Sequence, residues 1–386
     1  MNTVDLCQEI DKLLDADFFE TSYGKHFALK HLSDELVKDF ITDAQVEAFI
    51  RFNEMKERSP KVFFHGHRVN LTNDKGHDKA QFDHIMRLHS GGASLICNQT
   101  QKVSSNISFL TNFLEQKFEG KAHGNLYVTP SKMTAFNPHY DRHDVIVIQL
   151  RGSKKWSFYA PHHSKVEKHS FSKDDLEKTD EVVLKTGSVL YVPHGLIHVA
   201  ESTDETSWHI TLGIKGYYWK DALKDIIDQA ANPHHLNLLR RLPIKSGTAT
   251  QLQDEAKALF DMMKSQVDLS HGLAKFKEAY PDLASPNLAE PTQGFAAPDS
   301  IDDNQLFSFI NPSELIVETS EERLSLSHPD RKSQLYLKLS LLGLISRMRK
   351  TSEFSPASVG GEETIRDVKL FFSFLMENGF IKTLAT

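Results

Sequence analysis

Two histidines and one aspartate stand out because together they could hold a metal ion. His139 and Asp141 lie two positions apart, directly before the apolar run Val145-Ile-Val-Ile148. On an extended strand, side chains two positions apart project to one face, so this imidazole and this carboxylate can reach the same ion. Two histidines and a carboxylate on one side of an octahedral iron leave three neighbouring coordination positions open. The missing histidine should therefore come from a separate segment.

The segment Gly187-Ser-Val-Leu-Tyr-Val-Pro-His-Gly-Leu-Ile-His198 supplies it. Gly187 opens a strand, Pro193 and Gly195 form a tight turn, and His198 follows that turn. A His-x-Asp pair alone is more often a hydrogen-bonded pair than a pair of metal ligands. In combination with His198 the motif favours a metal centre, although zinc with three ligands and a water remains an alternative to iron.

Two further histidines lie close to these motifs. His143 shares the face of His139 and Asp141 if the strand runs straight, and His194 lies inside the turn before His198. Both are expected to orient a ligand rather than to bind the metal themselves.

The elements that must position these residues change in character along the chain. Short apolar segments bounded by Gly, Pro and Ser-Asp turns predict strands at 93–97, 125–129, 145–150, 155–159, 182–184, 188–192 and 208–214, with a helix at 107–118 closed by Gly120. Several short strands at regular spacing predict a barrel or sandwich. We therefore expect an α+β protein with a strand-rich core at 93–216.

The regions on either side have helical spacing. Residues 1–92 predict a helical region that packs on the core, with Asp43 as an N-cap. Helices are expected at 219–231, 234–241 and 250–267 within a segment at 217–280, followed by a linker at 281–300. The last region, 301–386, predicts helices at 333–345 and 364–378 and a strand at 380–384, an arrangement that fits a winged-helix-like domain.

Composition limits the classes of function. The 386 residues carry a formal net charge of −7, and residues 301–386 contain ten Lys and Arg against twelve Asp and Glu, which disfavours direct DNA binding. Two distant cysteines indicate a reducing compartment. The first residues lack a signal-peptide pattern and no run of 18 apolar residues occurs, so we expect a cytoplasmic protein with no membrane contact.

Four motifs in the core resemble those of the JmjC-type oxygenases, and within them the ribosomal oxygenases and their bacterial cupin-like relatives. These motifs are Asn125-Leu-Tyr-Val-Thr-Pro130, Pro138-His-Tyr-Asp141, Gln149-Leu-Arg-Gly-Ser-Lys-Lys-Trp156 and Tyr191-Val-Pro-His-Gly-Leu-Ile-His198. The wider layout of helical region, barrel, helical dimerisation segment and winged-helix-like domain resembles the same family. The resemblance implies that the catalytic core at 93–216 is a double-stranded β-helix, or jelly roll. It also implies a homodimer and an Fe(II)- and 2-oxoglutarate-dependent hydroxylase.

The resemblance also implies residue roles. His139, Asp141 and His198 would bind Fe(II), Lys154 would bind the distal carboxylate of 2-oxoglutarate, and Asn125 and Tyr127 would line the cosubstrate pocket. A carboxylate inside a barrel needs a cation or strong donors, which agrees with Lys154, although its Gly-Ser-Lys-Lys setting would also suit a solvated turn lysine.

Two positions depart from the family pattern. Arginyl-hydroxylating bacterial members have arginine at the Lys154 position, and Gly213 stands where some members have serine in the last core strand. His209 and Thr211 share that strand face and could compensate.

The substrate implied by the resemblance is a protein residue, such as an arginine or histidine of a ribosomal protein. A small molecule or a peptide natural product is an alternative substrate. A non-catalytic metal-binding cupin scaffold or sensor, a zinc hydrolase and a transcription regulator are alternative functions.

Overall fold

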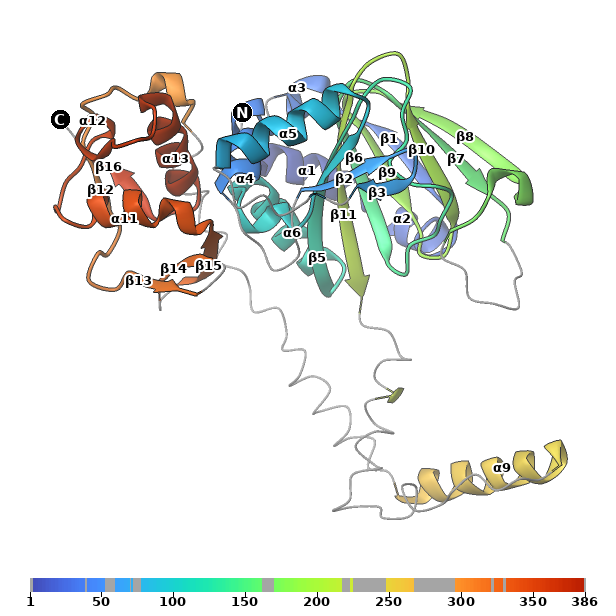
Figure 1. Ribbon diagram of the computed structural model, residues 1–386. Coiled ribbons are helices and arrows are strands. Elements are labelled where there is room, and N and C mark those ends of the chain that lie inside the picture. The colour runs from blue at the N-terminus through green and yellow to red at the C-terminus, as the bar shows by residue number, and fades with distance from the viewer. Residues whose placement is uncertain are drawn as a thin grey trace.

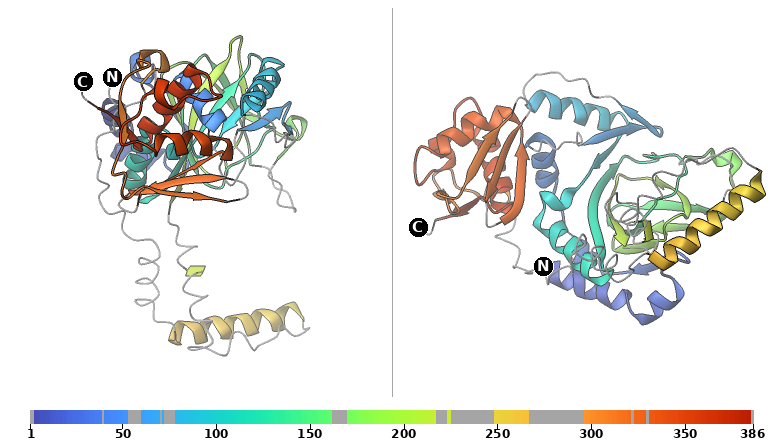
Figure 2. Two further views of the ribbon diagram at one scale, coloured as in Figure 1. Left: turned by 60° about the vertical axis from the view of Figure 1, so that its left-hand side comes forward. Right: turned by 90° about the horizontal axis from the view of Figure 1, so that it is seen from below.

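The computed structural model describes residues 3–38, 40–52, 60–69, 71, 78–161, 170–216, 223–224, 248–266, 296–320, 323–328 and 331–384. Strands from the middle of the sequence form a barrel, which helices from the N-terminal part cover on its outer side (Figure 1). The C-terminal elements form a separate body that lies against those helices (Figure 2). The predicted α+β class with a jelly-roll core is therefore confirmed.

The barrel consists of two sheets. The larger sheet has the strand order β1-β9-β6-β11-β5-β4-β2-β3, and the smaller one β10-β7-β8. The strands are β1 (Ala28–His31), β2 (Lys61–Phe64), β3 (His67–Val69), β4 (Ser94–Cys97), β5 (Gly120–Thr129), β6 (Asp144–Arg151), β7 (Lys154–Tyr159), β8 (Lys178–Leu184), β9 (Ser188–Val192), β10 (Ile197–Ser202) and β11 (Ser207–Gly216). All neighbours pair antiparallel, and β10 places its residues opposite β7 from Ile197↔Tyr159 to Ser202↔Lys154.

The central strand β6 shows why this segment is apolar throughout. Val145 and Val147 face the barrel interior and pack with Trp156 and other inner residues. Ile146 and Ile148 face outward and belong to the core under the helices. A strand that is covered on both faces loses the alternation of polar and apolar residues, and the continuous run Val145-Ile-Val-Ile148 follows from that.

The N-terminal region differs from the prediction in two ways. It contains the helices α1 (Thr3–Leu13), α2 (Ala16–Thr21), α3 (Asp34–Val37), α4 (Asp43–Phe52) and α5 (Asp78–Ser90), but also β1, β2 and β3, which extend the larger sheet. The predicted N-cap Asp43 is wrong by one position. Thr42 is the cap, because its hydroxyl accepts from the Gln45 N–H at 3.2 Å and the Gln45 side chain accepts from the Thr42 N–H at 2.8 Å.

Helix α6 (Ser105–Lys117) confirms the prediction for 107–118, but Gly120 begins β5 instead of ending the helix. Helix α9 (Ala249–Gln266) confirms the helix predicted at 250–267. The predicted helix at 234–241, all of the one at 219–231 except residues 223–224, and most of the predicted linker lie outside the described residues. Among the described helices, none has the length and apolar character that crossing a membrane requires.

The C-terminal elements are β12 (Phe307–Phe309), β13 (Ile316–Thr319), β14 (Leu324–His328), β15 (Arg331–Leu337), α11 (Leu342–Met348), α12 (Pro356–Val359), α13 (Ile365–Glu377) and β16 (Ile381–Thr383). The predicted helix at 333–345 is wrong in its first part, since β15 pairs there with β14. Helix α13 and strand β16 confirm the other two predictions. Helix α13 packs on α4, with Phe371 and Phe52 rings 5.1 Å apart.

A candidate metal centre inside the barrel

The side chains of His139, Asp141 and His198 converge at one point. Each offers one ligand atom, and these atoms all lie within 4.8 Å of one another. The His198 Nε2 atom is 3.8 Å from an Asp141 carboxylate oxygen, and the two imidazole rings are 4.6 Å apart. Within the described ranges this is the one group of three such side chains that could hold an ion.

Backbone pairing brings the two segments together. His139 and His198 exchange hydrogen bonds, with the His139 N–H donating to the His198 carbonyl at 3.0 Å and the His198 N–H to the His139 carbonyl at 2.8 Å. The Gly195 N–H also donates to the Asp141 carbonyl at 2.8 Å. His198 lies on β10, but His139 and Asp141 lie in irregular backbone before β6 and not on a strand as predicted. The two side chains meet because of these cross-links and not because of strand alternation.

Both histidines present Nε2 to the centre. The Nδ1 atoms of His139 and His198 lie 2.9 Å from the carbonyl oxygens of Asn137 and Leu196. A carbonyl oxygen only accepts, so each Nδ1 carries a proton and each Nε2 keeps a free lone pair. Burial, together with the nearby His139, lowers the pKa of His198 to about 4, so its ring is neutral near pH 7. A neutral imidazole is the form that binds metals.

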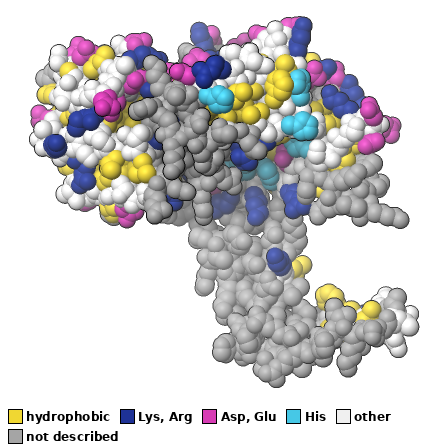
Figure 3. Space-filling view, in the orientation of Figure 1, with side chains coloured by type: hydrophobic (Ala, Val, Ile, Leu, Met, Phe, Trp, Pro, Cys, Tyr) yellow, Lys and Arg dark blue, Asp and Glu magenta, His cyan; other side chains and the backbone are white. Residues whose placement is uncertain are grey.

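The three side chains form part of a pocket of about 440 Å³ inside the barrel. Several histidine side chains gather on the barrel face seen in Figure 3. The predicted residues Lys154, Asn125 and Tyr127 all line the pocket, as do His209 and Thr211 from the last strand. Phe136 and Ser170 line it from the connections.

Lys154 is the unusual residue of this pocket. Its side chain is buried, with 1% of the residue exposed, and its Nζ donates to the Thr129 hydroxyl at 3.0 Å. No ion pair joins it to any acidic residue in the described part of the chain. Burial lowers the pKa of Lys154 to about 7. A buried amine without a carboxylate partner fits an anionic ligand in the pocket and does not fit a solvated turn.

Asn125 and Tyr127 have partners of their own. The Asn125 side-chain oxygen accepts from the Gln99 N–H at 3.0 Å. The Tyr127 ring stacks on His209 with ring centres 4.6 Å apart. His209 is itself buried, and burial followed by the charge of Lys154 lowers its pKa. Its Nδ1 has no hydrogen-bond partner among the described residues and is available to a ligand.

Trp156 is a further residue of the pocket, for which the sequence predicted no role there. It lines the pocket, and its indole N–H has no hydrogen-bond partner among the residues described. The signal was present, because Trp156 lies two positions after Lys154 on the same strand and so shares its inward face. A prediction for Lys154 therefore also applied to Trp156.

The two additional histidines lie in different surroundings. His143 lines the pocket beside His123, with ring centres 5.2 Å apart. A Cβ atom on Gly213 would lie 2.4 Å from the His123 ring and 2.5 Å from the His143 ring, so a serine at this position would have to displace both rings. The His194 side chain is half exposed and lies outside the pocket lining.

Fold and site together define a cupin-type barrel with a His-Asp-His cluster in an internal pocket. Residues 98–222 match the JmjC domain family. That match covers the strands from β5 to β11 and all three clustered side chains.

Curated relatives agree with this. A protein of Dictyostelium discoideum named bifunctional lysine-specific demethylase and histidyl-hydroxylase NO66 is 30% identical over 244 residues, which are 59% of this chain and 46% of that protein. Human ribosomal oxygenase 1 is 35% identical over 167 residues, 40% of this chain and 26% of that protein. The chain thus spans less than half the length of these relatives. A crystal structure of Escherichia coli ycfD aligns over 95% of this chain and 97% of its own, with a TM-score of 0.46 and 14% identity.

Proposed function

We propose that this chain is an Fe(II)- and 2-oxoglutarate-dependent oxygenase that hydroxylates a protein residue, with His139, Asp141 and His198 as the metal ligands. The observation that carries the proposal is the convergence of these three side chains at the wall of an open internal pocket. Both histidines offer a free Nε2, and the three ligands form the set that non-haem iron oxygenases use.

The residues of the pocket fit both Fe(II) and 2-oxoglutarate. The metal would be held by two neutral imidazoles and a carboxylate, and the dicarboxylate by groups deeper in the pocket. Lys154 supplies a buried cation for the distal carboxylate, and the unpartnered N–H of Trp156 supplies a donor near it. When bound, iron and 2-oxoglutarate would activate O₂, with one oxygen atom entering a substrate C–H bond as hydroxyl and the other entering succinate as the cosubstrate loses CO₂.

The residues of the chain bind the cosubstrate, orient the metal ligands and exclude water from the reacting centre. Lys154 pairs with the cosubstrate carboxylate while the Thr129 hydroxyl holds its ammonium group in place. Asn125 and Tyr127 line the cosubstrate pocket beside it. The aromatic rings of Tyr127, Trp156 and Phe136 enclose the reacting centre and keep water from it. The backbone carbonyls of Asn137 and Leu196 fix the orientation of the two imidazoles.

The printed names of the relatives support a protein substrate. One is a histidyl-hydroxylase and another a ribosomal oxygenase, so we propose an arginine or histidine of a ribosomal protein as the target. A net charge of −7 would attract such a basic partner by electrostatic steering. A ribosomal substrate also favours the cytoplasm as the location.

The proposed domains are a helical region at 1–92, the catalytic core at 93–216, a dimerisation segment at 217–280, a linker at 281–300 and a winged-helix-like domain at 301–386. Helix α9 supports a homodimer, because it lies away from the barrel in Figure 1 and Phe260 on it is 61% exposed. An exposed aromatic side chain on such a helix suits a contact with a second copy. For the last domain we propose a protein–protein role.

Succinate formation from 2-oxoglutarate by the full chain with Fe(II) tests the activity. His139→Ala should abolish succinate formation, whereas His31→Ala, which removes an imidazole with a 59% exposed side chain, should leave it intact. Metal binding without succinate formation would favour a non-catalytic scaffold. For the substrate, mass spectrometry of ribosomal proteins from cells with and without the chain should find one added oxygen on a single peptide.

A further inference from the structure

Asp144 is a buried carboxylate outside the pocket that connects the two ligand-bearing segments. It is the first residue of β6, is 1% exposed, and accepts from the Tyr191 hydroxyl at 2.7 Å and from the His194 N–H at 3.2 Å. The Tyr191 hydroxyl in turn accepts from the Gly24 N–H at 2.8 Å. The four residues form a chain of hydrogen bonds from the N-terminal helices to the turn before His198.

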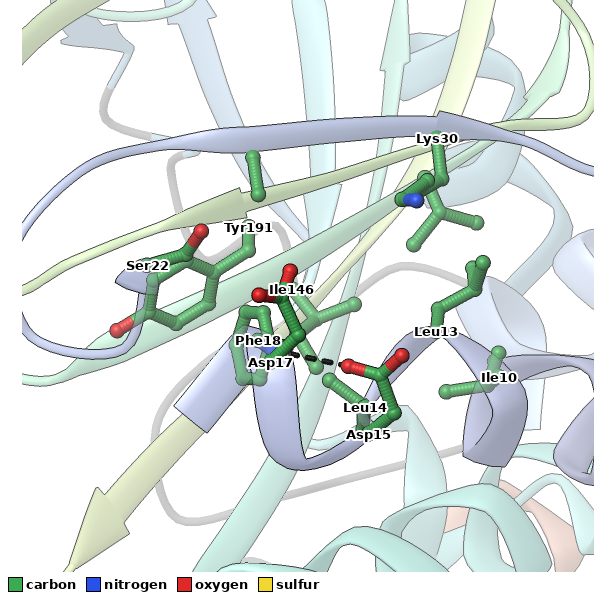
Figure 4. A pocket seen from close by; sticks show the side chains of 12 residues that line it. Ile10, Leu13, Leu14, Asp15, Asp17, Phe18, Ser22, Lys30, Ile146 and Tyr191 are labelled. Carbon is green, nitrogen blue, oxygen red and sulfur yellow. Dashed lines mark hydrogen bonds between the residues drawn. The ribbon is translucent and has the colours of Figure 1, made fainter. Parts of the chain in front are cut away.

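The chain of bonds lies on the outer face of the sheet. Tyr191 on β9 pairs with Ile146 on β6, and both belong to the core under the helices, whereas Val145 lines the metal pocket. Figure 4 shows Tyr191 beside Phe18 and Ser22, where it lines a small separate pocket between α1, α2 and the sheet. Tyr191 and Asp144 therefore act on the metal centre only through other residues.

Their place in the sequence connects them to the ligands. Asp144 follows Asp141 by three residues, and His194 precedes His198 by four. The Asp144 carboxylate holds the His194 N–H at the start of the turn, while the Gly195 N–H bonds to the Asp141 carbonyl. These two bonds fix the turn against the backbone that leads into β6, and so they set how far Asp141 lies from His198.

We propose that Asp144, held by Tyr191, is a positioning residue that sets the spacing between Asp141 and His198 and thereby the metal affinity of the site. The inference rests on the proposed function only in that these side chains bind a metal. Burial raises the pKa of Tyr191, so its hydroxyl keeps its proton and donates to the carboxylate. Without this donor the buried carboxylate loses a strong bond, and the turn is held less tightly.

Cobalt(II) titration of the full-length apo chain, followed by visible absorption, tests the proposal. Tyr191→Phe removes one hydroxyl and keeps the ring, and it should weaken Co²⁺ binding about tenfold and shift the absorption spectrum. Asp144→Ala should weaken binding further, and Asp144→Asn should restore most of it, because its amide oxygen can accept the same two bonds. Tyr336→Phe is the matched control, since it removes a hydroxyl bonded to Gln334 on β15.

Thermal unfolding of each apo variant separates metal affinity from stability. If Tyr191→Phe lowers stability but leaves the Co²⁺ affinity and spectrum unchanged, the network is only structural and the inference is wrong. If Asp144→Asn binds as weakly as Asp144→Ala, charge and not hydrogen bonding is responsible, and the positioning role is again wrong. A wild-type chain that binds Co²⁺ no better than His139→Ala would instead overturn the proposed function itself.

Discussion

Two of the buried cations in the described part of the chain, Arg51 and Lys154, have different surroundings. Arg51 on α4 is 6% exposed and bonds to Glu47 on the same helix at 3.1 Å and to Asp367 on α13 at 2.7 Å. Lys154 in the barrel is 1% exposed and bonds to a hydroxyl. Burial alone would lower both pKa values. The carboxylates around Arg51 outweigh burial and raise its pKa, whereas that of Lys154 falls to about 7.

The difference distinguishes Arg51, a cation that stabilises the fold through ion pairs, from Lys154, a cation placed to bind a ligand. Arg51 joins the N-terminal helices to the C-terminal elements, which lie side by side in Figure 1. Its charge is balanced within the folded chain. The charge of Lys154 is not balanced by any described carboxylate, so the pocket becomes electrostatically complete only with an anion bound. Substitution of Arg51 should therefore change the free energy of unfolding, and substitution of Lys154 the affinity for 2-oxoglutarate.

Arg51→Met should produce the largest change in stability. It leaves the Asp367 carboxylate at a helix contact without its cation, and breaking a buried ion pair costs about 3 kcal/mol. We expect the free energy of unfolding in urea to fall by about that amount, while the affinity for 2-oxoglutarate stays unchanged. If Arg51→Met instead lost affinity for 2-oxoglutarate and kept its stability, the structural role assigned to Arg51 would be wrong.

Lys154→Met should have the opposite effect, weakening 2-oxoglutarate binding without lowering stability. Removing one partner of a buried charge pair costs about 2–5 kcal/mol of binding, so the Kd for 2-oxoglutarate should rise about 30-fold or more. Stability should not fall, because the variant also removes a buried amine without a carboxylate partner. Isothermal titration with 2-oxoglutarate and thermal unfolding measure the two effects. Lys154→Arg should retain part of the affinity, since it keeps a cation at this position.

The pKa of Lys154 predicts two opposite pH effects. In the folded chain this pKa is about 7, below its unfolded value, so the unfolded chain binds more protons above pH 7 and stability rises with pH there. A bound dicarboxylate favours the charged amine, so binding takes up a proton above pH 7. The affinity for 2-oxoglutarate should then fall by roughly tenfold per pH unit above 7. Lys154→Met should lose both dependences, and a slope that persists in this variant would assign it to another group.

The barrel was predictable because its pattern is local. Strand β6 is an unbroken apolar run, and turns of Gly and Pro separate it from its neighbours. Strand β10 was missed, since Ile197-His-Val-Ala-Glu-Ser202 follows directly on the turn and contains only three apolar residues besides the ligand. The strand at β15 was read as helix because Leu335 and Leu337 lead directly into the apolar residues of α11.

The site was predictable in its residue types but not in its surroundings. The spacing of His139, Asp141 and His198 is a local signal, whereas the bonds that orient them depend on backbone carbonyls that no sequence pattern marks. The partners of Arg51 could not be found either. Asp367 lies 316 residues away in the chain, and a charged residue on a helix is usually solvated. Whether a charged residue is solvated or paired inside the protein depends on its burial, and burial is a property of the whole fold.

Arg366→Ala should have the smallest effect and provides the control for Arg51. Arg366 also bonds to Glu47, through both nitrogens at 2.9 Å, but its side chain is 55% exposed. Exposed ion pairs contribute about 0.5 kcal/mol and are screened by salt. We expect Arg366→Ala to lower the free energy of unfolding by about that amount in low salt and by less at high salt. A loss as large as that of Arg51→Met would show that the contact between α4 and α13 depends on the number of ion pairs and not on their burial.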